Sequence, residues 1–357
     1  MLGADALGQV RIHWRARLSA VGIPLGVLDR LIGGSETWQA WADNWEAEGA
    51  QEEQHAKALE ARGLHISAGE SFALAALCFH FGQLVLFHDP ATKDRLSRRR
   101  EAAFRDGSRY LLPPARVFSV PSPSGAPLHA YLRLPRVRAG NVPCVLVVPG
   151  ADSVKEENLA FTNLIVERGM AAVCFDGPGQ GETRQHLPFF DDYERHVAPL
   201  IQKIANEPGI DGGRLGLVGF SFGGYLAPRV AAAVPGIAAC AVLGGCYDLS
   251  YWDALPPLLK EDFAYVFGVA TWNEAGERAR RLSLAPVLDS LRCPFLVVHG
   301  KRDGIFPWTD AEKMVAGARG PAELMLFDDG DHCCHNVNHR SKPAVADWLL
   351  ERLGAAR

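Results

Sequence analysis

A serine between two glycines is the residue whose surroundings predict chemistry most directly. The stretch GFSFG at 219–223 follows a short apolar run, 215–218, and precedes an apolar helix-like run, 225–234. A tight turn from a strand into a helix holds such a serine in a strained conformation and exposes its hydroxyl, and flanking glycines relieve the crowding. The N–H groups at the start of the helix face any negative charge that develops there. The pattern predicts that Ser221 attacks a carbonyl carbon; the alternative is a turn that only packs.

An acid and a base that could activate Ser221 follow it in the chain. A serine hydroxyl is a poor nucleophile unless a neighbouring base removes its proton. Asp303 lies a few residues beyond the apolar run 295–298, and His332 lies in the loop after the run that ends at Phe327. Sites built on such a serine turn have the order Ser, acid, His along the chain. We therefore expect His332 to be the base and Asp303 to be the acid that orients it.

Other residues near His332 could take its part. His335 and His339 follow in the same segment, and Asp331 is directly adjacent. We prefer His332 because it lies closest to the end of the preceding strand, where a base should lie. His299, at the end of the run 295–298, is expected to have a structural or pocket-lining role.

Two backbone amides are candidates for binding the oxyanion that forms during attack. One is the N–H of Phe222, directly after the serine. The other is the N–H of Ala151, in the loop 149–153 that follows the apolar run 144–148, where Gly150 permits a close backbone approach. Asp152, in the same loop, is a possible substrate-binding or auxiliary residue. The alternative is that this loop is an ordinary glycine turn into a helix.

Two further motifs could indicate a cofactor or a metal, but the residues of each fit the corresponding site poorly. The stretch GPGQG at 177–181 follows a strand, but its spacing is not that of a dinucleotide loop, and Pro178 lacks the N–H that a phosphate would need. The stretch HCCH at 332–335 has adjacent cysteines, which do not match the usual zinc spacing. We expect no cofactor and no metal.

The elements that must position these residues are short strands that alternate with helices. Eight runs read as strands, at 116–120, 128–134, 144–148, 171–175, 215–218, 239–243, 295–298 and 323–327. Nearly continuous apolar strands separated by helix-length segments predict an α/β fold with a mostly parallel, doubly wound sheet. In such sheets the chemistry lies in loops at the carboxyl ends of the strands, where every candidate residue falls.

The chain is expected to divide near residue 115. Region 1–114 reads as helical: tryptophans 38, 41 and 45 recur at helical spacing, and SAGE at 67–70 resembles a capping box that starts a helix. Region 115–357 contains all the predicted strands and catalytic candidates. Within it, the long aromatic segment 247–285 is either a lid over the site or a helical excursion.

Composition narrows the possible partners and compartments. The chain has 357 residues, of which 48% are hydrophobic, and a net charge of -4, so a nucleic-acid partner is not expected. The one basic cluster, at 93–100, reads as a solvated helix face. We see no secretory signal and no stretch that reads as a membrane span. Cysteines within apolar runs are typical of reduced thiols, and we expect a cytoplasmic protein.

Three motifs together resemble one branch of the α/β hydrolases. They are PGADSVKEE at 149–157, FDGPGQGE at 175–182 and GFSFGG at 219–224. The branch contains 2,6-dihydroxypseudooxynicotine hydrolase, fungal polyketide-shortening hydrolases and relatives of the fermentation-respiration switch protein. By motif the resemblance covers residues 115 to 357, and it extends over the N-terminal region by helical character and length.

This resemblance implies an α/β-hydrolase fold with an N-terminal helical cap region. It implies a triad of Ser221, Asp303 and His332 and oxyanion donors at Ala151 and Phe222. An additional acidic residue assists some members, and Asp248 or Asp253 could fill that place. A homodimer is also suggested by the family.

The expected activity is cleavage of a C–C bond beside a carbonyl, in a β-diketone or an acylated, polyketide-like aromatic compound. A carboxylesterase, thioesterase or peptidase is the first alternative. An acyltransferase or cyclase, or a binding protein without catalysis on the same fold, is the second.

Overall fold

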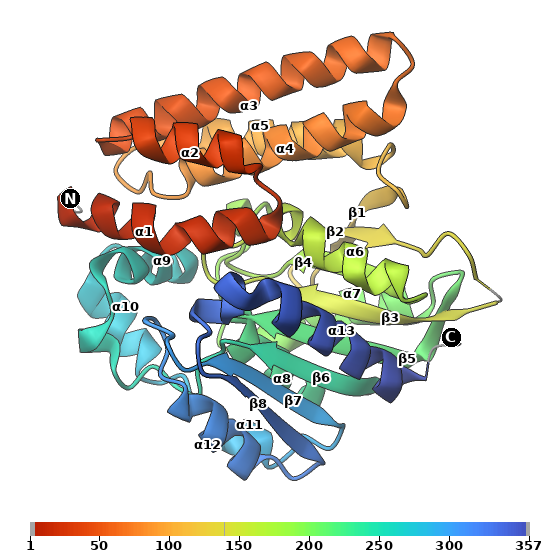
Figure 1. The fold of residues 1–357 in the computed structure, drawn as a ribbon. Coiled ribbons are helices and arrows are strands. Elements are labelled where there is room, and N and C mark those ends of the chain that lie inside the picture. Colours follow the sequence, from red (N-terminus) through yellow and green to blue (C-terminus); the bar gives the residue numbers. More distant parts are fainter. Residues whose placement is uncertain (1–3, 139, 355–357) are drawn as a thin grey trace. The chain divides into compact units, whose positions relative to one another are not determined.

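The computed structural model describes residues 4–138 and 140–354 (Figure 1). The chain forms two compact units, residues 1–117 and 118–357. Each unit is described separately below. Within the described residues, no helix is both long enough and apolar enough to cross a membrane.

The first unit is built from five helices: α1 Ala4–Val21, α2 Leu25–Gly34, α3 Trp38–Ala61, α4 His65–Gln83 and α5 Pro90–Ser108. Trp41 and Trp45 of α3 are completely buried, and the indole N–H of Trp41 donates to the carbonyl of Phe81 on α4 at 2.8 Å. The side chain of Thr37 accepts from the N–H of Ala40 and so caps α3. The helical character predicted for this region is confirmed.

The start predicted for α4 is wrong, because Ser67 lies inside its first turn. Helix α4 begins at His65, and no side chain caps it. The preceding helix ends with Gly63 at φ 74°, and the N–H of Leu64 donates to the carbonyl of Leu59. This is a Schellman-type helix end, and it leads directly into the next helix. Only three residues separate α3 from α4, so Ser67 falls within α4 and not before it.

The basic cluster on α5 is only partly a solvated face. Lys93 is buried, and its ammonium group donates to the carbonyls of Gln83 and Leu84 at 3.0 Å each. Arg100 is also buried, 2.8 Å from Glu101. The sequence pattern indicated a helix here. It did not show that the long side chains of Lys93 and Arg100 reach carbonyl and carboxylate acceptors within the fold.

The second unit contains most of an eight-stranded sheet in the order β1-β2-β4-β3-β5-β6-β7-β8. The strands are β1 Ala115–Pro121, β2 Pro127–Arg133, β3 Val142–Val148, β4 Ala171–Asp176, β5 Ile210–Phe220, β6 Ile237–Leu243, β7 Phe295–Gly300 and β8 Ala322–Phe327. β2 is antiparallel to β4. The remaining neighbours in this order, β4, β3, β5, β6, β7 and β8, all pair in parallel. All eight predicted strands and the mostly parallel sheet are confirmed.

Helices cover both faces of this sheet (Figure 1). They are η1 Lys155–Asn158, α6 Leu159–Glu167, η2 Thr183–Gln185, α7 Tyr193–Ala205, α8 Gly223–Ala233, α11 Ala285–Leu288, α12 Thr309–Gly317, η4 His332–Val337 and α13 Asn338–Leu353. α6 and α13 lie on one face, and α7 and α8 lie on the other. Strands such as β3 and β4 are buried along their whole length, as expected of a sheet covered on both sides.

The segment 247–285 is largely helical. It contains η3 Trp252–Ala254, α9 Pro257–Phe267 and α10 Trp272–Ala279. The rings of Phe263 and Phe267 on α9 pack against the ring of Phe222, with centroids 5.1 and 6.4 Å apart. This segment therefore supports the residue that follows Ser221, and its role as a lid stays a prediction.

Candidate active site

The serine turn has the strained geometry that its glycines predict. Strand β5 ends at Phe220, Ser221 has φ 54°, and α8 begins at Gly223. A Cβ atom on Gly219 would lie 2.0 Å from the carbonyl oxygen of Gly223, and one on Gly223 would lie 2.1 Å from that of Val148. Both positions exclude any larger residue, because backbone atoms cannot move aside as a flexible side chain can.

A continuous chain of hydrogen bonds joins the three predicted residues. Ser221 Oγ lies 2.8 Å from His332 Nε2, and His332 Nδ1 lies 2.8 Å from Asp303 Oδ2. The carboxylate can only accept, so Nδ1 has the hydrogen and Nε2 is left free to accept from the serine hydroxyl. The parallel strands β5, β7 and β8 end at one edge of the sheet, which brings these residues together.

Asp303 is held as an anion by donors on both of its oxygens. Oδ1 accepts the N–H groups of Ile305 and Phe306 at 2.8 and 3.0 Å, and Oδ2 accepts from His332. Burial by itself would raise the pKa of Asp303, but the charge of His332 and the hydrogen bonds from His299 and His332 outweigh it, so this pKa lies well below its usual value. The residue is therefore ionised at neutral pH.

His299 is a supporting residue whose contact the sequence did not reveal. It is fully buried, and its Nε2 lies 3.1 Å from Asp303 Oδ2 and 3.2 Å from the carbonyl oxygen of Phe306. Both neighbours are acceptors, so Nε2 must have the hydrogen. The four-residue spacing from His299 to Asp303 across one turn was the signal that could have indicated this contact.

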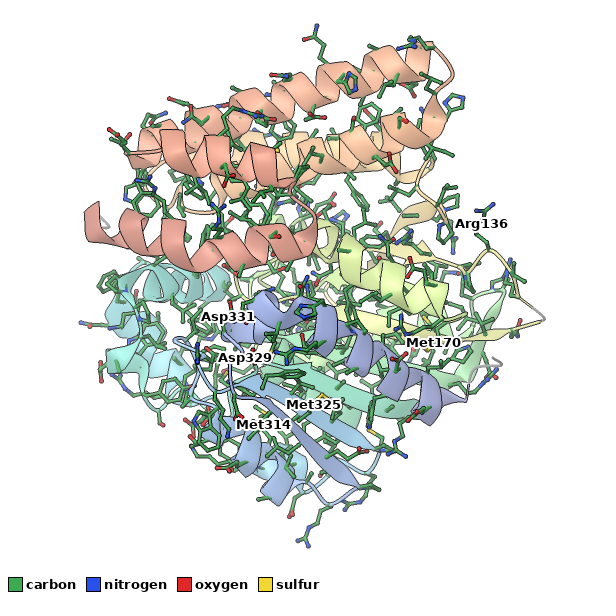
Figure 2. The ribbon with its side chains drawn as sticks, viewed as in Figure 1. Arg136, Met170, Met314, Met325, Asp329 and Asp331 are labelled. Carbon is green, nitrogen blue, oxygen red and sulfur yellow. The ribbon has the colours of Figure 1, made fainter. Side chains whose placement is uncertain are left out.

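Two aspartates, Asp329 and Asp331, lie in the loop just before His332 (Figure 2). Asp329 pairs with Arg340 at 2.8 Å, and Asp331 accepts the N–H of Asn336 at 3.1 Å. His332 is followed by Cys333 and Cys334, both with φ in the left-handed region. Of the histidines that compete for the role of base, the structure brings His332 to Ser221.

The pKa of His332 reflects two opposing effects. Burial alone would lower it, but the carboxylate of Asp303 stabilises the protonated ring more strongly, so the pKa lies well above its ordinary value.

The two predicted oxyanion donors are backbone amides with no acceptor in the part of the chain that the structure describes. Within residues 4–138 and 140–354, the N–H groups of Ala151 and Phe222 donate to no protein atom, although both residues are buried. A Cβ on Gly150 would lie 3.1 Å from Ser221 Cβ and 3.6 Å from Ser221 Oγ. The loop thus lies directly against the serine, and buried N–H groups normally have partners. Two such amides could bind a carbonyl oxygen here.

The predicted auxiliary acids do not join this hydrogen-bonded chain. Asp253 is 84% exposed and pairs with Arg280 at 2.9 Å. Asp248 accepts the N–H and hydroxyl of Ser250. Asp152 is half-buried in the same loop as Ala151. In the described part of the chain, no group of three or more His, Cys, Asp or Glu is arranged to hold a metal ion.

Comparison with known proteins shows which families this chain resembles. A family model described as "Esterase FrsA-like" matches residues 26–251, and one described as "Prolyl oligopeptidase family" matches residues 190–356. The chain is 35% identical over 321 residues to 2,6-dihydropseudooxynicotine hydrolase of Paenarthrobacter nicotinovorans, a match that covers 89% of this chain and 86% of that protein. It is 30% identical over 233 residues to "Alpha/beta hydrolase pydG" of an Acremonium species, a match that covers 61% of this chain and 53% of that protein.

Solved structures agree with the sequence matches. A crystal structure of 2,6-dihydroxy-pseudo-oxynicotine hydrolase superposes with a TM-score of 0.88 and 32% identity, covering 95% of each chain. The fold class predicted from the alternating strands and helices is thereby confirmed. The chain is a hydrolase with the α/β-hydrolase fold, and it belongs to the FrsA-like esterase family.

Proposed function

We propose that Ser221, His332 and Asp303 form the catalytic triad of a serine hydrolase that cleaves a bond next to a carbonyl. The observation that supports this most directly is the chain of two 2.8 Å hydrogen bonds from the serine through the histidine to the carboxylate. The strained backbone at Ser221 is a second support, since strain of this kind is concentrated at functional sites.

In this proposal each group of the site has one role. His332 Nε2 takes the hydroxyl proton as Ser221 Oγ attacks the carbonyl carbon. Asp303 holds the ring in the required tautomer and stabilises its protonated form. The oxyanion accepts hydrogen bonds from the N–H groups of Ala151 and Phe222, which have no acceptor in the described chain.

The leaving group then departs with the proton held by His332. Water enters, loses a proton to the same nitrogen, and releases the acyl group from Ser221. The sequence of bonds formed and broken is that of serine acyl transfer, and it needs no cofactor.

The proposed substrate is a β-diketone or an acylated polyhydroxy-aromatic compound whose C–C bond is cleaved. A carbon leaving group must be stabilised as an enolate or a phenol, and both substrate types allow this. Support comes from the match to 2,6-dihydropseudooxynicotine hydrolase over 89% of this chain. The alternative is hydrolysis of an ester, thioester or peptide, which the esterase and prolyl oligopeptidase family models favour.

Turnover of two probes by the wild type and by Ser221→Ala would test this proposal. We expect an aryl β-diketone to be cleaved faster than a short aryl ester, with both activities abolished in Ser221→Ala. A preference for the ester would favour the esterase alternative. Turnover that survives in Ser221→Ala would contradict the triad itself.

We further propose that the protein works in the cytoplasm. All eight cysteines are unpaired in the structure, as is usual where thiols are kept reduced. The homodimer and the absence of a cofactor stay predictions. Size-exclusion chromatography would test the first, and the absorbance and metal content of the purified chain would test the second.

A further inference from the structure

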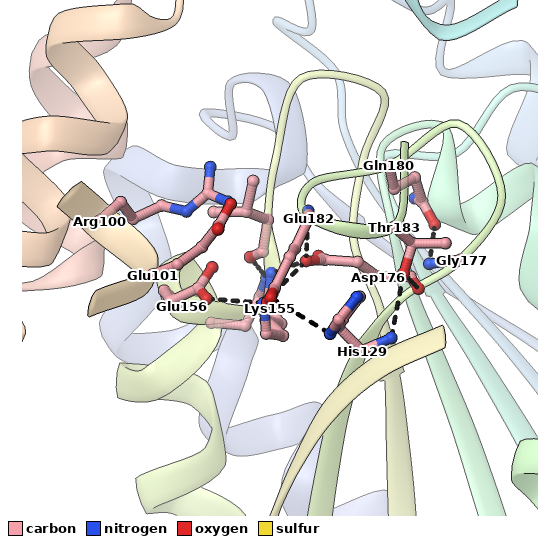
Figure 3. Close-up of polar contacts among 12 residues, drawn as sticks. Arg100, Glu101, His129, Lys155, Glu156, Asp176, Gly177, Gln180, Glu182 and Thr183 are labelled. Atoms are coloured by element: carbon pink, nitrogen blue, oxygen red, sulfur yellow. Dashed lines mark hydrogen bonds and ion pairs between the residues drawn. The ribbon is translucent and has the colours of Figure 1, made fainter. Parts of the chain in front are cut away.

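Gln180, in the GPGQG stretch after β4, is a buried side chain whose amide is fully hydrogen-bonded. Its Oε1 accepts the N–H of Gly177 at 3.1 Å and the hydroxyl of Tyr193 at 2.9 Å. Its Nε2 donates to the carbonyl oxygens of Pro149 and Gly150 at 2.6 and 3.2 Å. Two donors face one end of the amide and two acceptors face the other, so it has a single possible orientation. Figure 3 shows Gln180 beside Gly177.

One of these acceptors belongs to the same peptide group as a proposed oxyanion donor. The carbonyl of Gly150 and the N–H of Ala151 form one planar trans peptide, in which C=O and N–H point in opposite directions. The bond from Gln180 to Gly150 therefore turns the N–H of Ala151 away from the loop that follows β4. This N–H has no protein acceptor within the described residues.

The other end of the oxyanion loop is held by the same neighbouring loop. The carboxylate of Asp176 accepts the backbone N–H of Lys155 at 2.8 Å and its ammonium group at 3.0 Å. It also accepts the N–H of Glu182 at 3.0 Å (Figure 3). β3 and β4 are adjacent parallel strands, so the loops after them lie side by side. Residues 149–155 are thus held at both ends by residues 176–182.

The glycines of this stretch make that arrangement possible. A Cβ on Gly177 would lie 2.1 Å from the hydroxyl of Tyr193, and one on Gly181 would lie 2.3 Å from the carboxyl carbon of Asp176. Gly181 also has φ 43°, which favours glycine. The spacing of glycines that resembles a nucleotide loop is explained here by close packing around two anchoring side chains.

From these contacts we infer that Gln180 is a positioning residue for the oxyanion hole. It acts through the Gly150–Ala151 peptide and does not touch the substrate. The inference rests on the proposed function, because it assigns Ala151 the role of oxyanion donor. Loss of one such donor in other serine hydrolases costs about 100- to 1000-fold in rate, so a misdirected donor should cost about 10- to 100-fold.

The test is the rate at which a fluorophosphonate labels Ser221 in the full-length chain. The phosphoryl oxygen of this probe needs the same amides as a carbonyl oxygen, and the natural substrate is not required. Gln180→Met keeps the length of the side chain but removes both donors. We expect its labelling to be about 10- to 100-fold slower, with the pH midpoint of labelling unchanged because the triad is intact.

Thr183→Val is the matched control. Thr183 is buried in the same segment, donates to the carbonyl of Asp176 at 2.7 Å and accepts the N–H of His129 at 3.0 Å. Within the described residues it forms no hydrogen bond to Pro149 or Gly150. We expect labelling within about threefold of the wild type. An equal loss in both variants, or a rate for folded Gln180→Met within threefold of the wild type, would overturn the inference. Labelling that persists in Ser221→Ala would instead contradict the proposed function.

Gln180→Glu keeps the inference testable if Gln180→Met does not fold. A buried carboxyl group is neutral below a raised pKa, and the neutral form donates one hydrogen bond where the carboxylate donates none. Its labelling rate relative to the wild type should therefore rise as the pH falls. A ratio that is constant with pH would contradict the positioning role.

Discussion

Replacement of Asp303 by asparagine tests whether this carboxylate sets the tautomer of His332. Oδ1 already accepts the N–H groups of Ile305 and Phe306, so an asparagine keeps its carbonyl oxygen there and turns its NH2 toward His332. Nδ1 must then accept, and the ring hydrogen moves to Nε2, which lies 2.8 Å from Ser221 Oγ. A nitrogen that already has a hydrogen cannot take the serine proton.

The expected loss is large because the base is lost while the rest of the site remains. The same exchange in a well-studied serine protease lowers kcat by about 10,000-fold, and we expect about 1000- to 10,000-fold here. This corresponds to about 4 to 5.5 kcal/mol of transition-state stabilisation.

The pH dependence gives a second, independent readout. The carboxylate of Asp303 raises the pKa of His332. Activity needs the neutral ring, so wild-type activity falls as the pH drops through this raised pKa. In Asp303→Asn the acid limb should move to lower pH, because the charge that stabilised the protonated ring is gone.

Initial rates of aryl ester cleavage between about pH 5 and pH 9 would measure both effects. Asp289→Asn is the control, since Asp289 is exposed and pairs with Arg319 at the surface, outside the hydrogen-bonded chain of the site. It should change kcat by less than about twofold. A loss below about tenfold in Asp303→Asn, or an acid limb at an unchanged pH, would refute the reasoning.

Two further substitutions test the supports of the site. His299→Phe removes a hydrogen-bond donor from Asp303 Oδ2, so kcat should fall by about tenfold. With one donor fewer, the carboxylate stabilises the protonated ring of His332 more strongly, so the acid limb should move to higher pH, opposite to the shift in Asp303→Asn. An unchanged pH profile would show that His299 only packs. Gly223→Ala places a Cβ 2.1 Å from the carbonyl oxygen of Val148 and should lower the free energy of unfolding in urea by about 2 kcal/mol or more. Gly33→Ala, where nothing lies within 4 Å, is its control and should leave stability unchanged or slightly raised; equal stability of the two variants would contradict the steric argument.

The sequence by itself determined the strands, the sheet and the serine turn. These features depend on local properties. Continuous apolar runs form buried strands, and a sharp turn from a strand into a helix needs glycines such as Gly219 and Gly223 on either side of the serine. The order of Ser221, Asp303 and His332 could also be predicted, because parallel strands bring their carboxyl ends to one edge. For the same reason, the loop of Ala151 could be placed beside the serine.

Only the tertiary structure decided which polar groups meet. The donors of Gln180 reach carbonyls about thirty residues earlier in the chain, at a separation of 31 for Pro149. His299 faces Asp303 rather than a pocket, and Lys93 reaches the last carbonyls of another helix. Asp253, a candidate auxiliary acid, points to solvent. Periodicity specifies which face of an element is apolar, but the partner of a polar side chain depends on which elements pack beside it, and that is a property of the whole fold.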